Sequence, residues 1–251
     1  MTDDPVLTAL IAETAADPDR LGLLLHGSRA AGTARPDSDH DVICVLTEPA
    51  YAARVAAGTR LERRELAGGT VDVLYQSLGR IAELAAEPDW YTATYFPFCR
   101  VVLDRTGTLA DRLADLREAA GRAAGERLMH HYEWYCTAFV RSLKCWRRGD
   151  ALGARLNAAE SAIPLVRVLY AAQGRWAPYH DHLARLLPEL EAGLGWPPGS
   201  VSGALARLVT DPEPAFQQEL QRRVAALLAE RGQHYPWAEE PARVQEWDFT
   251  A

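Results

Sequence analysis

The first 105 residues alternate short apolar runs with stretches of helical spacing. Four runs have the length of strands: 21–25, 41–46, 70–75 and 100–103. Three stretches, one before the first run and two between later runs, are expected to be helices: 4–15, 49–57 and 78–86. Residues 60–66 are highly charged and fit either an edge strand or a loop. The pattern predicts a small domain built from a mixed sheet with flanking helices.

From about residue 108 the strand-like runs stop and helical spacing takes over. We expect helices at 109–128, 131–147, 151–173, 180–187 and 214–231, with a break at 193–203. The tail at 234–251 is expected to be extended, with Trp237, Trp247 and Phe249 packing back on the body. The predicted fold class is therefore α+β, with an N-terminal domain at 1–106 and an all-α helical bundle at 107–251.

The net charge of −7 is unevenly distributed along the 251 residues. Residues 1–105 hold 16 acidic and 10 basic side chains, a balance of −6, whereas residues 106–251 hold 18 and 17, a balance of −1. Nucleic-acid binding depends on Lys and Arg that neutralise phosphates, so this balance argues against a nucleic-acid partner. An acidic cleft suits Mg²⁺ and a cationic small molecule, although acidic surfaces also simply keep proteins soluble.

The rest of the composition points to a cytoplasmic protein. No apolar run reaches the roughly 20 residues that cross a bilayer, so no membrane partner is expected. The acidic N-terminus lacks the basic region of a secretion signal. Four scattered cysteines show no zinc spacing and are expected to be reduced thiols: Cys44, Cys99, Cys136 and Cys145.

The candidate chemistry lies in three acids. Asp39 and Asp41 are one residue apart at the start of a predicted strand, so their side chains point to the same face and repel unless a cation lies between them. Asp72 interrupts the apolar run 70–75, where an unpaired carboxylate is costly to bury. Three converging carboxylates are what two-metal phosphoryl or nucleotidyl transfer needs. A turn at Gly27-Ser28 adds a place where the backbone can approach a phosphate closely.

This order of features resembles a known group, the nucleotidyltransferase superfamily of the DNA polymerase beta type. The matching order is a strand, Gly27-Ser28, ten residues at 29–38, Asp39-His40-Asp41, and Asp72 on a later strand. Further matching positions are Arg29, Gly32, Ala34 and Ser38. With them, residues 21–75 look like the small bacterial members, which include minimal nucleotidyltransferases and aminoglycoside adenylyltransferases of the streptomycin/spectinomycin type.

The resemblance implies roles for individual residues. Asp39 and Asp41 would hold two Mg²⁺ ions, and Asp72 would be the third ligand, the base that takes the proton of the substrate hydroxyl, or both. Gly27 and Ser28 would contact the nucleotide phosphates. Residues expected to help position these phosphates are Arg29, Ser38 and Lys144, the single lysine of the chain. Three structural alternatives stay open: a solvated Arg29, a turn-capping Ser38, and a Lys144 on a solvated helix face.

The resulting hypothesis is a Mg²⁺-dependent nucleotidyltransferase that transfers AMP from ATP to a hydroxyl group of a small, possibly cationic molecule. An aminoglycoside-like antibiotic is the expected acceptor. Residues that could line a cleft for it are Trp90, Tyr91, Glu133, Trp134 and Glu160. Two alternatives remain, namely a protein-modifying nucleotidyltransferase of the antitoxin type and a non-catalytic nucleotide-binding protein. The sequence leaves open whether the protein is a monomer or a homodimer.

Overall fold

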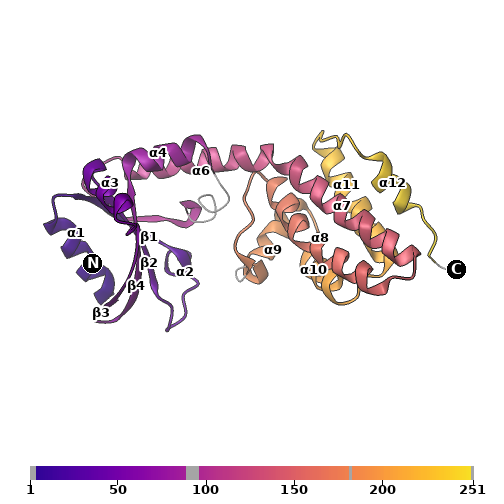
Figure 1. Cartoon of the computed structure of the whole chain (residues 1–251), viewed down its shortest axis with the longest axis horizontal. Coiled ribbons are helices and arrows are strands. Elements are labelled where there is room, and N and C mark those ends of the chain that lie inside the picture. Colours follow the sequence, from indigo (N-terminus) through magenta and orange to yellow (C-terminus); the bar gives the residue numbers. More distant parts are fainter. Residues whose placement is uncertain (1–3, 89–95, 181–182, 250–251) are drawn as a thin grey trace. The chain divides into compact units, whose positions relative to one another are not determined.

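A computed structural model describes residues 4–88, 96–180 and 183–249 of the chain (Figure 1). By backbone contacts, the chain divides into two compact units, Met1–Ala120 and Gly121–Ala251. The predicted domain boundary at 106/107 stays a prediction. Each unit is described by itself below.

The first unit is organised around a five-stranded mixed sheet with the strand order β3-β4-β2-β1-β5. Its strands are β1 (Arg20–His26), β2 (His40–Leu46), β3 (Leu61–Leu66), β4 (Gly69–Ser77) and β5 (Arg100–Asp104). β2 and β4 run parallel, and the other neighbours are antiparallel. The charged stretch at 60–66, left open by the sequence, is therefore the edge strand β3. A two-residue turn joins it to β4.

Helices cover both faces of this sheet. The helices of the first unit are α1 (Pro5–Ala16), α2 (Gly27–Ala30), α3 (Glu48–Ala56), α4 (Leu78–Ala86) and α6 (Leu109–Glu126), which runs into the second unit, with a 3₁₀ turn at Phe96–Phe98. Apolar residues of α1 pack with Val42, Cys44 and neighbouring residues on one face. Residues of α4 and the start of α6 pack with Ile43 and Val45 on the other. Adjacent residues of β2 thus point to opposite, separately covered faces.

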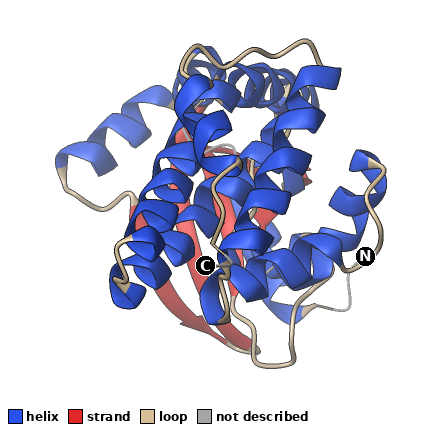
Figure 2. Cartoon of the chain, turned by 90° about the vertical axis from the view of Figure 1, so that its right-hand side faces the viewer, coloured by secondary structure: helices blue, strands red, loops and turns tan. Residues whose placement is uncertain are grey.

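The described elements of the second unit are all helices (Figure 2). They are α7 (Leu128–Arg147), α8 (Ala151–Ala171), α9 (Leu183–Leu194), α10 (Ser200–Thr210), α11 (Pro214–Glu230) and α12 (Glu239–Gln245). Their main core joins buried residues such as Tyr135, Leu169 and Val224. The α+β fold class, with a mixed sheet followed by a helical region, is confirmed.

Two expectations about the second unit are wrong. The break predicted at 193–203 is shorter, at 195–199, and helix α10, which was not predicted, follows it; a buried carboxylate, Glu191, accepts hydrogen bonds from Gly199 N and Val201 N at the start of α10, at 2.7 Å each. The tail is not simply extended, because α12 forms within it. Trp247 and Phe249 pack back on the body as expected, but Trp237 is 72% exposed.

Two further observations concern the helices and the cysteines. None of the helices in the described ranges is long and apolar enough to cross a membrane. All four cysteines are free thiols, and three of them are buried.

Candidate active site

The three acids gather at one end of the sheet. Asp41 of β2 and Asp72 of β4 are direct partners in the parallel ladder, so their side chains lie side by side on the same face. This is the face of Ile43 and Val45, covered by α4 and α6. Asp39 lies just before β2, two residues from Asp41. The structure thus brings together the acids that the sequence places 31 to 33 positions apart.

The turn after β1 lies directly against Asp41. Gly27 has a φ of +67°, a conformation that favours glycine. A Cβ atom at this position would come within 2.1 Å of Asp41 Oδ2 and 2.8 Å of its Cγ. Gly27 is therefore needed twice, once for the backbone turn and once for the space that the Asp41 carboxylate occupies.

Asp41 carries the electrostatic signature of the cluster. Burial, together with the nearby charges of Asp39 and Asp72, raises its pKa from 3.8 to about 6. Its partner in the antiparallel ladder is His26, which is buried beside it. Burial lowers the pKa of His26 to about 4, so its ring is neutral near pH 7. His26 therefore does not supply a positive charge to the three acids.

The positive charge comes from Arg63, which the sequence analysis did not single out. Its Nη1 lies 3.3 Å from Asp72 Oδ2, and its Nη2 lies 3.3 Å from Asp39 Oδ2. A signal for this contact existed in the sequence. A tight turn before Gly69 pairs Leu66 with Gly69, and three positions further along the hairpin it pairs Arg63 with Asp72. The uncertainty about a strand at 60–66 hid this pairing.

The other predicted phosphate-binding residues shape the loop before β2. Arg29 donates hydrogen bonds through Nε to the carbonyl oxygen of Asp39, at 3.1 Å, and through Nη2 to that of Ser38. Ser38 Oγ accepts a hydrogen bond from Arg35 N at 2.8 Å, which is the turn-capping arrangement. Ser28 lies in α2, and its carbonyl oxygen accepts from Thr33. Their contact with a nucleotide stays a prediction.

His40, between the two acids, points to the opposite face of the sheet. It is buried, and its Nε2 lies 2.8 Å from Asp4 Oδ2. The same Asp4 side chain caps α1 by accepting hydrogen bonds from Val6 N and Leu7 N. Burial alone would raise the pKa of Asp4, but the hydrogen bonds from His40 and the two amides outweigh it and lower the pKa. His40 therefore ties the acidic strand to α1.

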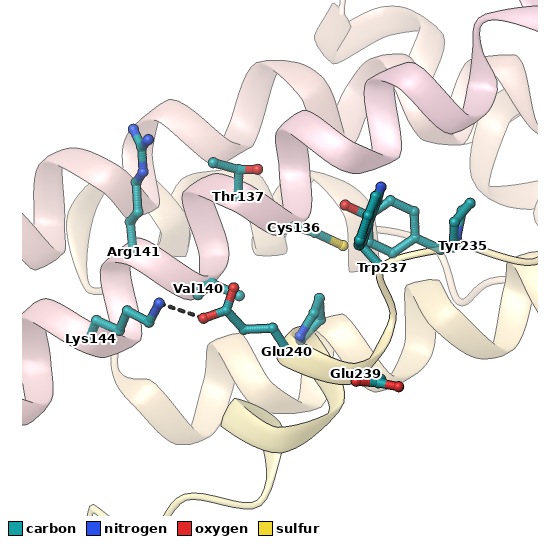
Figure 3. Close-up of a pocket in the computed structure, with 11 residues that line it drawn as sticks. Cys136, Thr137, Val140, Arg141, Lys144, Tyr235, Trp237, Glu239 and Glu240 are labelled. Atoms are coloured by element: carbon teal, nitrogen blue, oxygen red, sulfur yellow. Dashed lines mark hydrogen bonds and ion pairs between the residues drawn. The ribbon is translucent and has the colours of Figure 1, made fainter.

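Lys144 lies in the second unit, on α7. It is paired with Glu240 of α12 beside a cavity of about 490 Å³ that Arg141, Tyr235 and Trp237 also line (Figure 3). Lys144 is therefore ion-paired and not freely solvated, and its contact with a triphosphate stays a prediction.

The structure describes three of the five residues that were expected to line a cleft for the acceptor. Glu133, Trp134 and Glu160 are exposed residues of the second unit, and Trp134 is 60% exposed. Trp90 and Tyr91 lie outside the described residues.

The donor set fits a hard divalent cation, because all three side chains offer carboxylate oxygens, the ligands that Mg²⁺ prefers. Arg63 already places a cation between two of them. Within the described residues, no three His, Cys, Asp or Glu side chains are drawn together closely enough to hold a metal ion as they stand. The acids would have to close further, and the guanidinium between Asp39 and Asp72 would have to leave.

A family model matches the part of the chain that holds this site. Residues 11–105 match the family model of the nucleotidyltransferase domain. Among solved structures, a nucleotidyltransferase-like protein from Exiguobacterium sibiricum 255-15 is similar over 94% of this chain and 82% of its own, with 14% identity and a TM-score of 0.46. No curated protein matches the chain. The family match covers the Gly27 turn and all three acids, and the chain therefore carries a nucleotidyltransferase domain at residues 11–105.

Proposed function

We propose that the chain transfers a nucleoside monophosphate, AMP from ATP, to a hydroxyl group of a small molecule. The observation that carries the proposal is the pairing of Asp41 with Asp72 on adjacent strands, inside the nucleotidyltransferase domain. An acid cluster used only for structure would be matched by bases. Here three carboxylates share the charge of Arg63.

Each residue of the cluster has a proposed task. Asp39, Asp41 and Asp72 would hold Mg²⁺, which lowers the pKa of an attacking hydroxyl and stabilises charge on the phosphorus centre. Asp41 is ionised above about pH 6 and is thus a charged ligand near pH 7. Gly27 leaves room for its carboxylate, and Ser28 follows at the turn where a phosphate can approach. Asp72 is the candidate for the base as well as for the third ligand.

An aminoglycoside-like acceptor is proposed on two grounds. The first is the motif's resemblance to small bacterial members that modify such antibiotics. The second is the balance of −6 in residues 1–105, which attracts a polycationic sugar.

The test is pyrophosphate release from each of the four nucleoside triphosphates, with Mg²⁺ and a panel of aminoglycosides and uncharged polyols. We expect release with ATP that depends on both Mg²⁺ and an aminoglycoside. Release with uncharged polyols alone would contradict the acceptor class, and labelling of a protein in lysate would favour the protein-modifying alternative. An Asp72→Asn variant that binds Mg²⁺ like the wild type but does not turn over would identify Asp72 as the base.

A further inference from the structure

Arg63 makes two ion pairs in the cluster, and both are loose. The guanidinium spans Asp39 and Asp72 with two contacts of 3.3 Å, longer than the 2.7–2.9 Å typical of charge-assisted hydrogen bonds. Its side chain is 63% exposed, against 36% for Asp39 and 26% for Asp72. Arg63 therefore contacts the acids from the solvent side, on the edge strand β3.

The next residue of the same strand, Arg64, forms a closer ion pair. Arg64 points to the opposite face, where both Nη atoms lie 2.9 Å from the two carboxylate oxygens of Glu13. Its side chain is 23% exposed. The two successive arginines therefore form different ion pairs. Arg64 contacts one carboxylate at 2.9 Å, whereas Arg63 is shared between two carboxylates at 3.3 Å.

We propose that Arg63 is a positioning residue that holds Asp39 and Asp72 together in the metal-free protein and gives them up to a divalent cation. The inference rests on the proposed function, since it assigns Asp39 and Asp72 to a metal. Charge and distance decide the competition. A divalent ion carries twice the charge of a guanidinium and approaches carboxylate oxygens to about 2.1 Å, so its attraction for the same two groups is several times larger.

The exposure of Arg63 makes the exchange feasible. A side chain that is 63% exposed can leave the acids for water without being buried or losing a packed position. Arg63 also lies on the edge strand β3, opposite Asp72 in the hairpin, so only one neighbouring strand flanks it. The consequence is measurable. Metal binding in the wild type must first break two ion pairs, so removal of Arg63 should increase the affinity for the metal.

The test is Mn²⁺ binding to the full chain without nucleotide at pH 7.5, measured from the electron paramagnetic resonance signal of free Mn²⁺. We expect Arg63→Gln to bind Mn²⁺ about three- to tenfold more tightly than the wild type, the range for two partly exposed ion pairs. Arg63→Lys, which keeps the charge but lacks the two-pronged head, should fall between them. The matched control is Arg64→Gln, which removes the same charge one residue away on the other face and should stay within about twofold of the wild type.

A purely structural role for Arg63 predicts the opposite sign, because disordered acids bind a metal less well. Equal or weaker Mn²⁺ binding by folded Arg63→Gln would overturn the inference and leave the proposed function standing. Equal tightening in Arg63→Gln and Arg64→Gln would also overturn it, because the effect would then be one of net charge. No Mn²⁺ binding by either the wild type or Arg63→Gln would overturn the proposed function and the inference together.

Discussion

The acidic side chains on the two faces of the sheet have different numbers of basic partners. On the face covered by α1, each acid of that helix and its cap has at least one basic partner: Asp4 contacts His40, and Glu13 contacts both Arg64 and Arg20. On the opposite face, Asp39, Asp41 and Asp72 share Arg63. The residues that make up the two sets alternate along β2 and β3, so the period-two geometry of a strand separates them.

We interpret this difference as a division of roles: the charged residues on the α1 face stabilise the fold, and the three acids on the opposite face are available for catalysis. On the α1 face each of these acids has a basic partner, and Asp4 also caps α1 and, through His40, ties that helix to the sheet. An excess of carboxylate is unfavourable unless something positive binds, and the charges of Asp39 and Asp72 add to the burial that raises the pKa of Asp41. The comparison predicts large effects on activity from one face, and small effects on stability alone from the other.

The largest effect is expected from removing one carboxylate of the unbalanced face. Asp41→Asn should lower nucleotidyl transfer by about a thousandfold, because bound metal contributes several kcal/mol to the transition state. Asp37→Asn is the matched control, since Asp37 is an exposed acid in the loop before β2. It should keep nearly full activity in the pyrophosphate assay. Similar losses in both variants would mean that overall charge, and not the cluster, matters.

A glycine pair tests the space beside Asp41. Gly27→Ala should lower activity by about a hundredfold, because its methyl group would overlap a carboxylate oxygen that lies 2.1 Å from the new Cβ position. Gly32→Ala is the control. Gly32 has the same kind of backbone, with φ of +70°, but nothing lies within 4 Å of the added atom. Both variants should lose about 1 kcal/mol of stability to backbone strain, and only Gly27→Ala should lose activity. Equal activity in the two variants would contradict the packing of Gly27 on Asp41.

Local patterns in the sequence predicted the parts of this picture that depend on neighbouring residues. The helix at 78–86 has the predicted bounds, and the strands that carry Asp41 and Asp72 were also predicted. The order of the Gly-Ser turn and the acids was enough to indicate the family. The helix and the two strands follow from the spacing of apolar and polar residues within a few positions of each other.

Contacts between distant residues decided what the sequence analysis missed. Helix α10 begins at residue 200 because Glu191, in the preceding helix, accepts hydrogen bonds from its first turn. Arg63 became a site residue only through the hairpin register that places it beside Asp72. The contact of His40 with Asp4 joins residues 36 positions apart. The hairpin sequence carried a signal for Arg63 and Asp72, but the spacing of apolar residues within one helix or strand does not contain any of these partners.

Stability as a function of pH should sharpen the comparison at Asp41. The folded metal-free protein raises the pKa of Asp41 from 3.8 to about 6, so it favours the protonated form. This contribution to stability is present below about pH 4 and is lost as the pH rises through about 6. Asp41→Asn resembles the protonated form and should therefore exceed the wild type in unfolding free energy by about 1–2 kcal/mol at pH 7.5, a value reduced for solvent screening.

The measurement is urea unfolding of both proteins between pH 4.5 and 8 in the presence of a chelator. The difference between Asp41→Asn and the wild type should shrink toward low pH, and Mg²⁺ should narrow it at high pH by stabilising the wild type. A difference that does not depend on pH would contradict the proposed electrostatic cost.

The smallest effects are expected on the α1 face. Asp4→Asn keeps a good helix cap but removes the charge beside His40, and should cost roughly 0.5–1 kcal/mol near pH 7. Because the pKa of Asp4 is lowered in the folded protein, this cost should disappear as the pH falls through and below about 4. Metal affinity should not change. A clear loss of Mn²⁺ binding in Asp4→Asn would show that the two faces are coupled through His40.

The central claim is that the unbalanced face is a metal site and the balanced face is not. The most direct test is the shift in thermal unfolding midpoint caused by Mg²⁺, compared between the wild type and the double variant Asp39→Asn/Asp72→Asn. Ligands that bind only the folded state raise the midpoint, and the rise grows with the logarithm of the ligand concentration relative to the dissociation constant. We expect a clear Mg²⁺-dependent rise in the wild type and none in the double variant. An equal rise in both proteins, or no rise in the wild type, would contradict the claim.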